Sequence, residues 1–102
     1  MVGNKHVGAY LDVGNTLPHS LPEHWIYVLK DFLKAVHVKD FNMNKLEFGI
    51  PLYGDVNWLG VKRAFEEIGY DWYLTIEVPP YKGDPCKAIF DSRDALRRIF
   101  GR

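Results

Sequence analysis

The sequence is poor in cysteine and contains no long apolar run. Its single thiol, Cys86, excludes an internal disulfide and is typical of proteins from a reducing compartment. No stretch approaches the roughly 20 apolar residues of a membrane span, or the apolar core of a secretion signal. These absences predict a cytoplasmic protein with no membrane partner.

An excess of charge of either sign is also missing. Thirteen lysine and arginine residues balance thirteen aspartate and glutamate residues, which gives a formal net charge of zero, and no basic run is present. Such a chain lacks the long-range positive field by which proteins attract DNA or RNA. We therefore expect no nucleic-acid partner.

The sequence is rich in side chains that can build a core. Hydrophobic residues make up 47% of its 102 positions, and aromatic residues make up 15%. This composition is enough for one small folded unit. We predict a single domain over residues 1–102.

Alternation of apolar and polar residues predicts three strands, over residues 7–13, 35–38 and 73–78. In each strand the apolar side chains share one face and the polar side chains share the other. The last polar residues on these faces are Asp12, His37 and Glu77. A sheet of this kind packs its apolar face on helices and leaves the polar face free to form a site.

A helix is predicted after the first strand. Ser20 and Glu23 have the spacing of a capping box, and Pro22 fits the first turn. Apolar residues recur at helical spacing and predict the buried stripe, which comprises Trp25, Val28, Leu29, Phe32 and Leu33.

Two more helices follow the second and third strands. Asp55 is the predicted N-cap of one and Gly69 its C-terminal cap, and the other runs from Asp84 to Gly101. Residues 41–53, between the second strand and its helix, read as a long polar loop, and loops of that length are often functional.

The predicted order of strand, helix, strand, helix, strand and helix indicates an α/β fold with parallel strands joined by right-handed crossovers. In such folds the active and ligand-binding sites lie at the carboxyl ends of the strands. Asp12, His37 and Glu77 are expected at that rim. Two carboxylates and an imidazole suit a divalent cation such as manganese, magnesium, cobalt or zinc.

Structural interpretations of the same residues stand beside this one. A lone strand histidine is usually a hydrogen-bonded core residue. The expected neighbours Asp12 and Glu77 favour instead that His37 derives from a metal ligand. Lys39 and Asp40 can be a solvated strand end, or Lys39 can contact a substrate. The sequence leaves both interpretations open.

Four motifs in this order resemble the carboxyl-terminal part of the xylose isomerase-like (β/α) barrels. They are LDVGN at 11–15, VHVKD at 36–40, GDVNW at 54–58 and TIEV at 75–78. This superfamily includes sugar isomerases, sugar and sugar-phosphate epimerases, inosose dehydratases and apurinic endonucleases. The resemblance implies a partial TIM barrel of three βα units, because a complete barrel has eight units in about 250 residues.

The resemblance also implies roles for individual residues. Asp12, His37 and Glu77 match three of the family's four metal ligands, and the fourth is a glutamate from an earlier strand. Glu77 matches a residue that also serves as an acid or base, and Asn15 falls where a side chain often contacts the substrate. In the family's isomerases and epimerases the metal polarises a carbonyl and its neighbouring hydroxyl, while a carboxylate removes the adjacent carbon-bound proton to give an enediolate.

Some positions depart from the family pattern. Residues 42–44 (Asn-Met-Asn) replace an arginine found in several epimerases, and Tyr53 stands where a Gly-Glu-Gly turn is usual. The ligand, a sugar or sugar phosphate, is therefore not identified further. The apurinic endonuclease branch is disfavoured because those enzymes use more histidines and a basic surface.

Two functions follow from the sequence. The first is a metal-dependent sugar isomerase or epimerase whose site is completed by oligomerisation or by upstream sequence. The second is a non-catalytic barrel fragment that acts as a folded association module. We expect a homo-oligomer, because three parallel strands leave two unpaired edges and an uncovered site face. The alternative is a truncation product that survives as a small three-layer fold.

Overall fold

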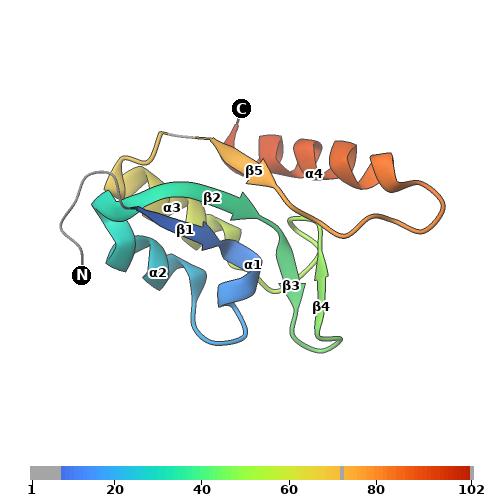
Figure 1. Cartoon of the computed structure of the whole chain (residues 1–102), viewed down its shortest axis with the longest axis horizontal. Coiled ribbons are helices and arrows are strands. Elements are labelled where there is room, and N and C mark those ends of the chain that lie inside the picture. Colours follow the sequence, from blue (N-terminus) through green and yellow to red (C-terminus); the bar gives the residue numbers. More distant parts are fainter. Residues whose placement is uncertain (1–7, 72, 102) are drawn as a thin grey trace.

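The computed structural model describes residues 8–71 and 73–101, and its centre is a parallel three-stranded sheet of order β1-β2-β5 (Figure 1). The predicted α/β class with parallel strands is confirmed, and the sheet is open, as in a partial barrel. Val7, predicted to begin the first strand, lies outside the described residues. The elements are β1 (Ala9–Asp12), α1 (Val13–Thr16), α2 (Pro22–Leu29), the 3-10 helix η1 (Lys30–Phe32), β2 (Leu33–Val38), β3 (Asp40–Asn42), β4 (Glu47–Gly49), α3 (Trp58–Ile68), β5 (Leu74–Ile76) and α4 (Pro85–Phe100).

The core lies between one face of the sheet and the helices α2 and α3. Alternation along the strands points Leu11, Val36 and Val38 to this face, as predicted, and all three are buried. They pack with Ile26 from α2 and with a group from α3 that comprises Trp58, Val61, Ala64 and Phe65. The opposite face of the sheet therefore carries the polar side chains of the strands.

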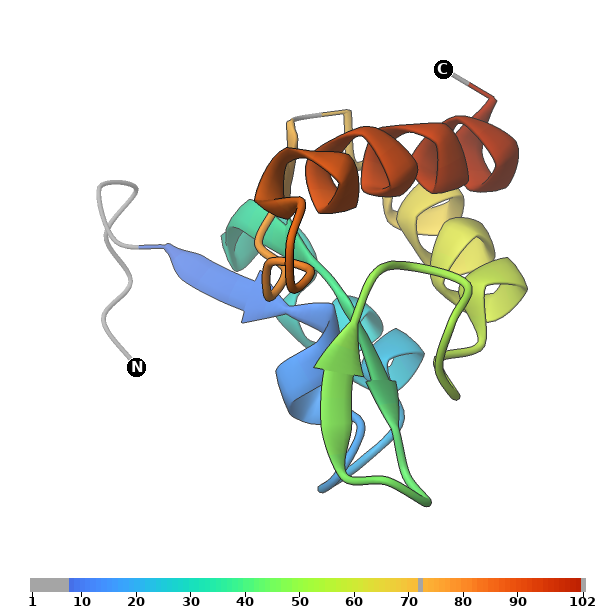
Figure 2. The same ribbon diagram turned by 90° about the vertical axis from the view of Figure 1, so that its right-hand side faces the viewer.

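The connection after β2 contains a two-stranded antiparallel sheet, so the prediction of a long loop over residues 41–53 was wrong. β3 pairs with β4, and the rings of Phe41 and Phe48 lie 5.0 Å apart across the two strands. Figures 1 and 2 show this hairpin projecting beyond the carboxyl end of β2. Strands of three residues are too short to reveal an alternating pattern in the sequence.

The starts of α2 and α3 also differ from the sequence prediction. The N-cap of α2 is Leu21, without a side-chain hydrogen bond, so the predicted capping box of Ser20 and Glu23 does not form. Asn57 caps α3 by accepting a hydrogen bond from the backbone of Gly60 at 3.1 Å. Asp55, the predicted cap, instead accepts from the backbone N–H of Met43 at 2.6 Å.

The ends of α3 and α4 confirm the sequence prediction. Gly69 and Gly101 end these helices in the left-handed conformation, with φ of 74° and 73°. Asp84 caps α4 by accepting from the backbone of Lys87 at 3.1 Å. None of the helices in the described part of the chain is both long and apolar enough to cross a membrane.

The predicted apolar stripe of α2 was partly wrong. The helix ends at Leu29, so Phe32 falls in η1 and Leu33 in β2. Ile26 is fully buried, whereas Trp25 is 40% exposed and Val28 is 72% exposed. Pro22 and Ile26 are the buried residues of α2, so its core-facing side differs from the predicted stripe.

Candidate metal centre

The register of the sheet brings the three predicted ligands to one rim. Asp12 on β1 pairs with His37 on β2, and His37 pairs with Thr75 on β5, two residues before Glu77. One ligand atom from each of Asp12, His37 and Glu77 lies within 4.8 Å of the others. We call these three residues the rim cluster.

Asp12 uses one carboxylate oxygen for structure and has the other free of hydrogen bonds. Its Oδ1 accepts from the backbone N–H of Asn15 at 3.1 Å and so caps α1. Its Oδ2 is buried without a hydrogen bond, although the ammonium of Lys39 lies 3.3 Å away. That distance satisfies an ion pair, but the two groups are not aligned as donor and acceptor. Oδ2 therefore has an ionic partner but accepts no hydrogen bond.

Glu77 is held by two donors. Nδ1 of His37 lies 2.9 Å from Oε2, and Nζ of Lys39 lies 3.1 Å from Oε1. The hydrogen bond with His37 and then the bond and charge of Lys39 lower the pKa of Glu77 below its ordinary value. The side chain is 54% exposed, so the carboxylate stays ionised at neutral pH while it remains open to a ligand.

Lys39 is part of this site and not a solvated strand end. Only 7% of the residue is exposed, and its ammonium pairs with both Asp12 and Glu77. It also lies 4.2 Å from the centre of the Phe48 ring. A Cβ atom on Gly14 would come within 2.7 Å of Cγ of Lys39, so glycine allows α1 to lie against the lysine stem.

Asp40 also contradicts the interpretation of a solvated strand end. Its carboxylate is fully buried and accepts hydrogen bonds from the backbone N–H groups of Phe41, Leu52 and Val56 and from the indole N–H of Trp58, at 2.8 to 3.0 Å. These four donors compensate the cost of burying the charge. Asp40 therefore fixes the loop between β4 and α3, and it does not face the rim cluster.

The donor set of the rim cluster fits a divalent cation. Two carboxylates and an imidazole are ligands that manganese, cobalt, zinc and, for the oxygens, magnesium accept. The specific observation that supports this fit is that Oδ2 of Asp12 is buried and accepts no hydrogen bond, so its lone pairs remain able to bind a cation in addition to the ion pair with Lys39. Within the described residues, the cluster supplies three protein ligands.

The two predicted substrate contacts lie on opposite flanks of the rim cluster. Asn15 lines a hollow of about 440 Å³ with Asp12, Tyr10 and Trp25, at the free edge of β1. Lys39 lines a second hollow of about 580 Å³, which also contains Glu77 and residues of the β3–β4 hairpin. The hairpin residues in this wall were missed by the sequence analysis, because strands of three residues leave no alternating pattern.

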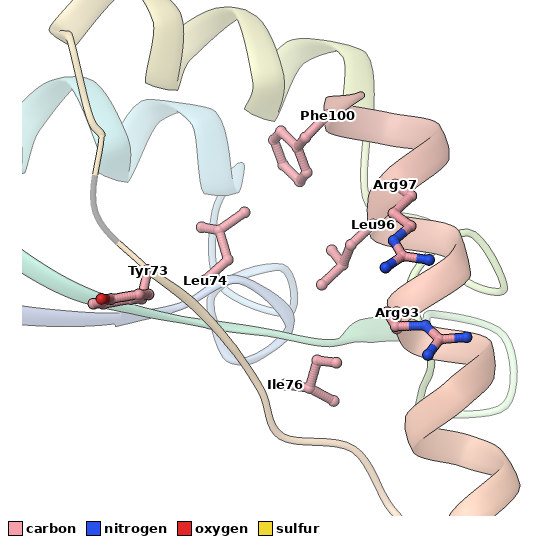
Figure 3. A pocket seen from close by; sticks show the side chains of 7 residues that line it. All are labelled: Tyr73, Leu74, Ile76, Arg93, Leu96, Arg97 and Phe100. Carbon is pink, nitrogen blue, oxygen red and sulfur yellow. The ribbon is translucent and has the colours of Figure 1, made fainter. Parts of the chain in front are cut away.

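A further hollow of about 290 Å³ lies between β5 and α4. Leu74 and Ile76 face Leu96 and Phe100 across it, and Arg93 and Arg97 flank it (Figure 3). None of the rim cluster residues lines this hollow. It is therefore a groove beside the edge strand β5 and not an extension of the candidate metal centre.

Residues 1–99 match a family model described as xylose isomerase-like TIM barrel. No curated protein matches the chain.

Proposed function

Since the chain belongs to the xylose isomerase-like TIM barrel family, we propose that it acts in a metal-dependent sugar isomerase or epimerase. The observation that carries this proposal is the convergence within 4.8 Å of Asp12 on β1, His37 on β2 and Glu77 directly after β5. The family resemblance of the motifs around these residues supports the same conclusion.

The proposed chemistry is proton transfer next to a sugar carbonyl. When bound by the rim cluster, a divalent cation supplies Lewis acidity at the carbonyl and hydroxyl oxygens of the sugar. The carboxylate of Glu77, whose pKa is lowered by His37 and Lys39, is ionised at neutral pH and can accept the carbon-bound proton to leave an enediolate. In an isomerisation the same carboxylate then returns the proton to the former carbonyl carbon, while the proton of the neighbouring hydroxyl moves to the former carbonyl oxygen. Lys39, 3.1 Å from Glu77, provides a fixed positive charge beside the developing oxyanion.

Calorimetric titration with manganese and zinc at neutral pH tests the metal centre. We expect one site per chain, and we expect Asp12→Ala and Glu77→Ala each to weaken it by more than about tenfold, since each removes a ligand. Asp31→Ala is the matched control, because Asp31 is an exposed aspartate of η1 away from the cluster. Equal affinity in all four proteins, or no binding of either metal, would contradict the proposal.

A second candidate function is a non-catalytic association module. It is favoured by Lys39, whose ammonium already neutralises part of the charge of Asp12 and Glu77. A folded chain that binds neither manganese nor zinc would support this alternative.

We also propose that copies of the chain associate. β1 and β5 are the edges of the sheet, and each borders a hollow with exposed apolar or aromatic side chains. The exposed side chains include Tyr10 on β1 and Tyr73 before β5, which are 76% and 86% exposed. Light scattering over a range of protein concentrations should show at least a dimer. A well-folded monomer at the highest concentration would contradict association.

A further inference from the structure

We propose that the hollow beside Lys39 and Glu77 binds an uncharged sugar in preference to a sugar phosphate. This inference rests on the proposed function and narrows its substrate class. The hollow of about 580 Å³ is large enough for a monosaccharide, and it opens directly onto two residues of the site. We call it the hairpin hollow, and it is lined by Lys39, Leu46, Glu47, Phe48, Glu77, Val78 and Pro79.

The charges around the hairpin hollow do not favour an anion. Lys39 is the cation in its wall, and two carboxylates already pair with it, at 3.1 and 3.3 Å. Glu47 adds a further negative charge to the wall. Three carboxylates thus face one ammonium, and a divalent cation in the rim cluster would only balance the total. A phosphate dianion would therefore gain no net attraction.

The donors that phosphate groups require are also missing from this wall. Within the described part of the chain, no arginine lines the hairpin hollow, and so no guanidinium fork can bind a phosphate in a bidentate manner. Lys45 precedes the lining residue Leu46 on the hairpin but does not itself line the hollow. Sugar hydroxyls, in contrast, can donate hydrogen bonds to carboxylates such as those of Glu47 and Glu77.

The apolar part of the wall matches the remaining surface of a sugar. Phe48 is held over Lys39 at 4.2 Å and presents a ring to the hollow, and Leu46 and Pro79 flank it. The C–H faces of a monosaccharide can pack against such a surface while its hydroxyls reach the carboxylates. The hairpin hollow therefore combines apolar and acidic walls, which suits a polyhydroxylated neutral molecule.

The test compares free ketoses of four to six carbons with their terminal phosphate esters, using saturation-transfer NMR with the protein and magnesium. We expect free ketoses to bind, and the esters to bind at least about fivefold more weakly, because the hollow offers no net attraction to offset the cost of desolvating the phosphate. Tighter binding of the esters would overturn the inference while leaving the proposed isomerase function intact. A protein that binds magnesium or manganese but binds none of the free ketoses would also overturn it. Loss of metal binding itself would instead count against the proposed function.

Two variants locate the binding in the hairpin hollow. Glu47→Lys should improve ester binding relative to ketose binding by about fivefold, because it reverses a charge in the wall. Glu66→Lys on α3 is the matched control and should leave this ratio unchanged. Phe48→Ala should weaken ketose binding without affecting manganese affinity, and Leu59→Ala, at an exposed position of α3, should affect neither. Equal behaviour of Glu47→Lys and Glu66→Lys would overturn the assignment to this hollow.

Discussion

Two carboxylates at the carboxyl end of the sheet, Asp12 and Asp40, are used in opposite ways. Asp40 is fully buried and accepts four hydrogen bonds, which satisfy its charge completely. Asp12 accepts one hydrogen bond at Oδ1, and its Oδ2 accepts none, although the ammonium of Lys39 lies 3.3 Å away. The comparison teaches that a carboxylate whose oxygens all accept hydrogen bonds is structural. A carboxylate with an oxygen that accepts none can also bind a ligand.

Removing the saturated carboxylate should have the largest effect on stability. In Asp40→Ala, the N–H groups of Leu52, Val56 and Trp58 lose their acceptor inside the protein. We expect the free energy of unfolding to fall by about 4 kcal/mol, measured by urea denaturation. Asp12→Ala should cost only about 1 kcal/mol, the value of a helix cap.

If Asp40→Ala does not fold, Asp40→Asn supplies the measurement, since it keeps the shape and removes the charge. Equal stabilities of the Asp12 and Asp40 variants would break the comparison between the two carboxylates.

Gly54 lies against the carboxylate of Asp40, so a substitution there tests the same buried hydrogen-bond network. A Cβ atom here would clash with the carboxylate of Asp40 and come within 2.6 Å of the carbonyl oxygen of Phe41. Gly54→Ala should therefore destabilise the protein by about 2 kcal/mol in urea denaturation. Gly49→Ala is the matched control, because no atom lies within 4 Å of the added Cβ, and its effect should stay within about 0.5 kcal/mol. A neutral Gly54→Ala would show that the loop can move away from Asp40.

Lys39 decides how available the rim cluster is to a cation. In Lys39→Met the ammonium that pairs with Asp12 and Glu77 is lost, while the apolar stem is retained. Calorimetry should show manganese binding about tenfold more tightly, because the competing charge is gone. Lys87→Met, which removes an ammonium paired with Asp91 on α4, should leave manganese affinity unchanged. Weaker binding in Lys39→Met would indicate that the lysine positions the carboxylates for the metal.

The smallest expected effect is on stability in acid. His37 and Lys39 lower the pKa of Glu77, so its stabilising contribution is present above the ordinary value of 4.5 and is lost as the pH falls through the lower, folded-state pKa. The difference in unfolding free energy between the native protein and Glu77→Gln should therefore shrink as the pH falls below 4.5. Urea denaturation at a series of pH values measures it. A difference that does not change with pH would contradict the hydrogen bonds assigned to Glu77.

Much of the fold could be predicted because its signals are local. Alternation in β2 places Val36 and Val38 on the core face and His37 on the other, and this holds wherever the strand lies. Glycine at the end of α3 and aspartate at the start of α4 also act on their own chain neighbours. These signals do not depend on residues far away in the sequence.

The predictions that failed depended on distant partners. Asp55 has the chemistry of a helix cap, but it bonds to Met43 on the hairpin, and Asn57 caps α3 instead. For Lys39 and Asp40, which follow one another at a strand end, the sequence left two interpretations open, a solvated strand end and, for Lys39, a substrate contact. Their actual surroundings come from β5, the hairpin and α3, which no local pattern describes.

The sequence by itself determined three parallel strands and the set of side chains, Asp12, His37 and Glu77, at their carboxyl ends. Strand alternation and chain order are enough for this, because both are properties of the local chain. Only the tertiary structure decided that Lys39 pairs with Asp12 and Glu77, and that Asp40 lies in a separate buried hydrogen-bond network. The reason is that burial and pairing of a charge depend on which distant segments pack around it.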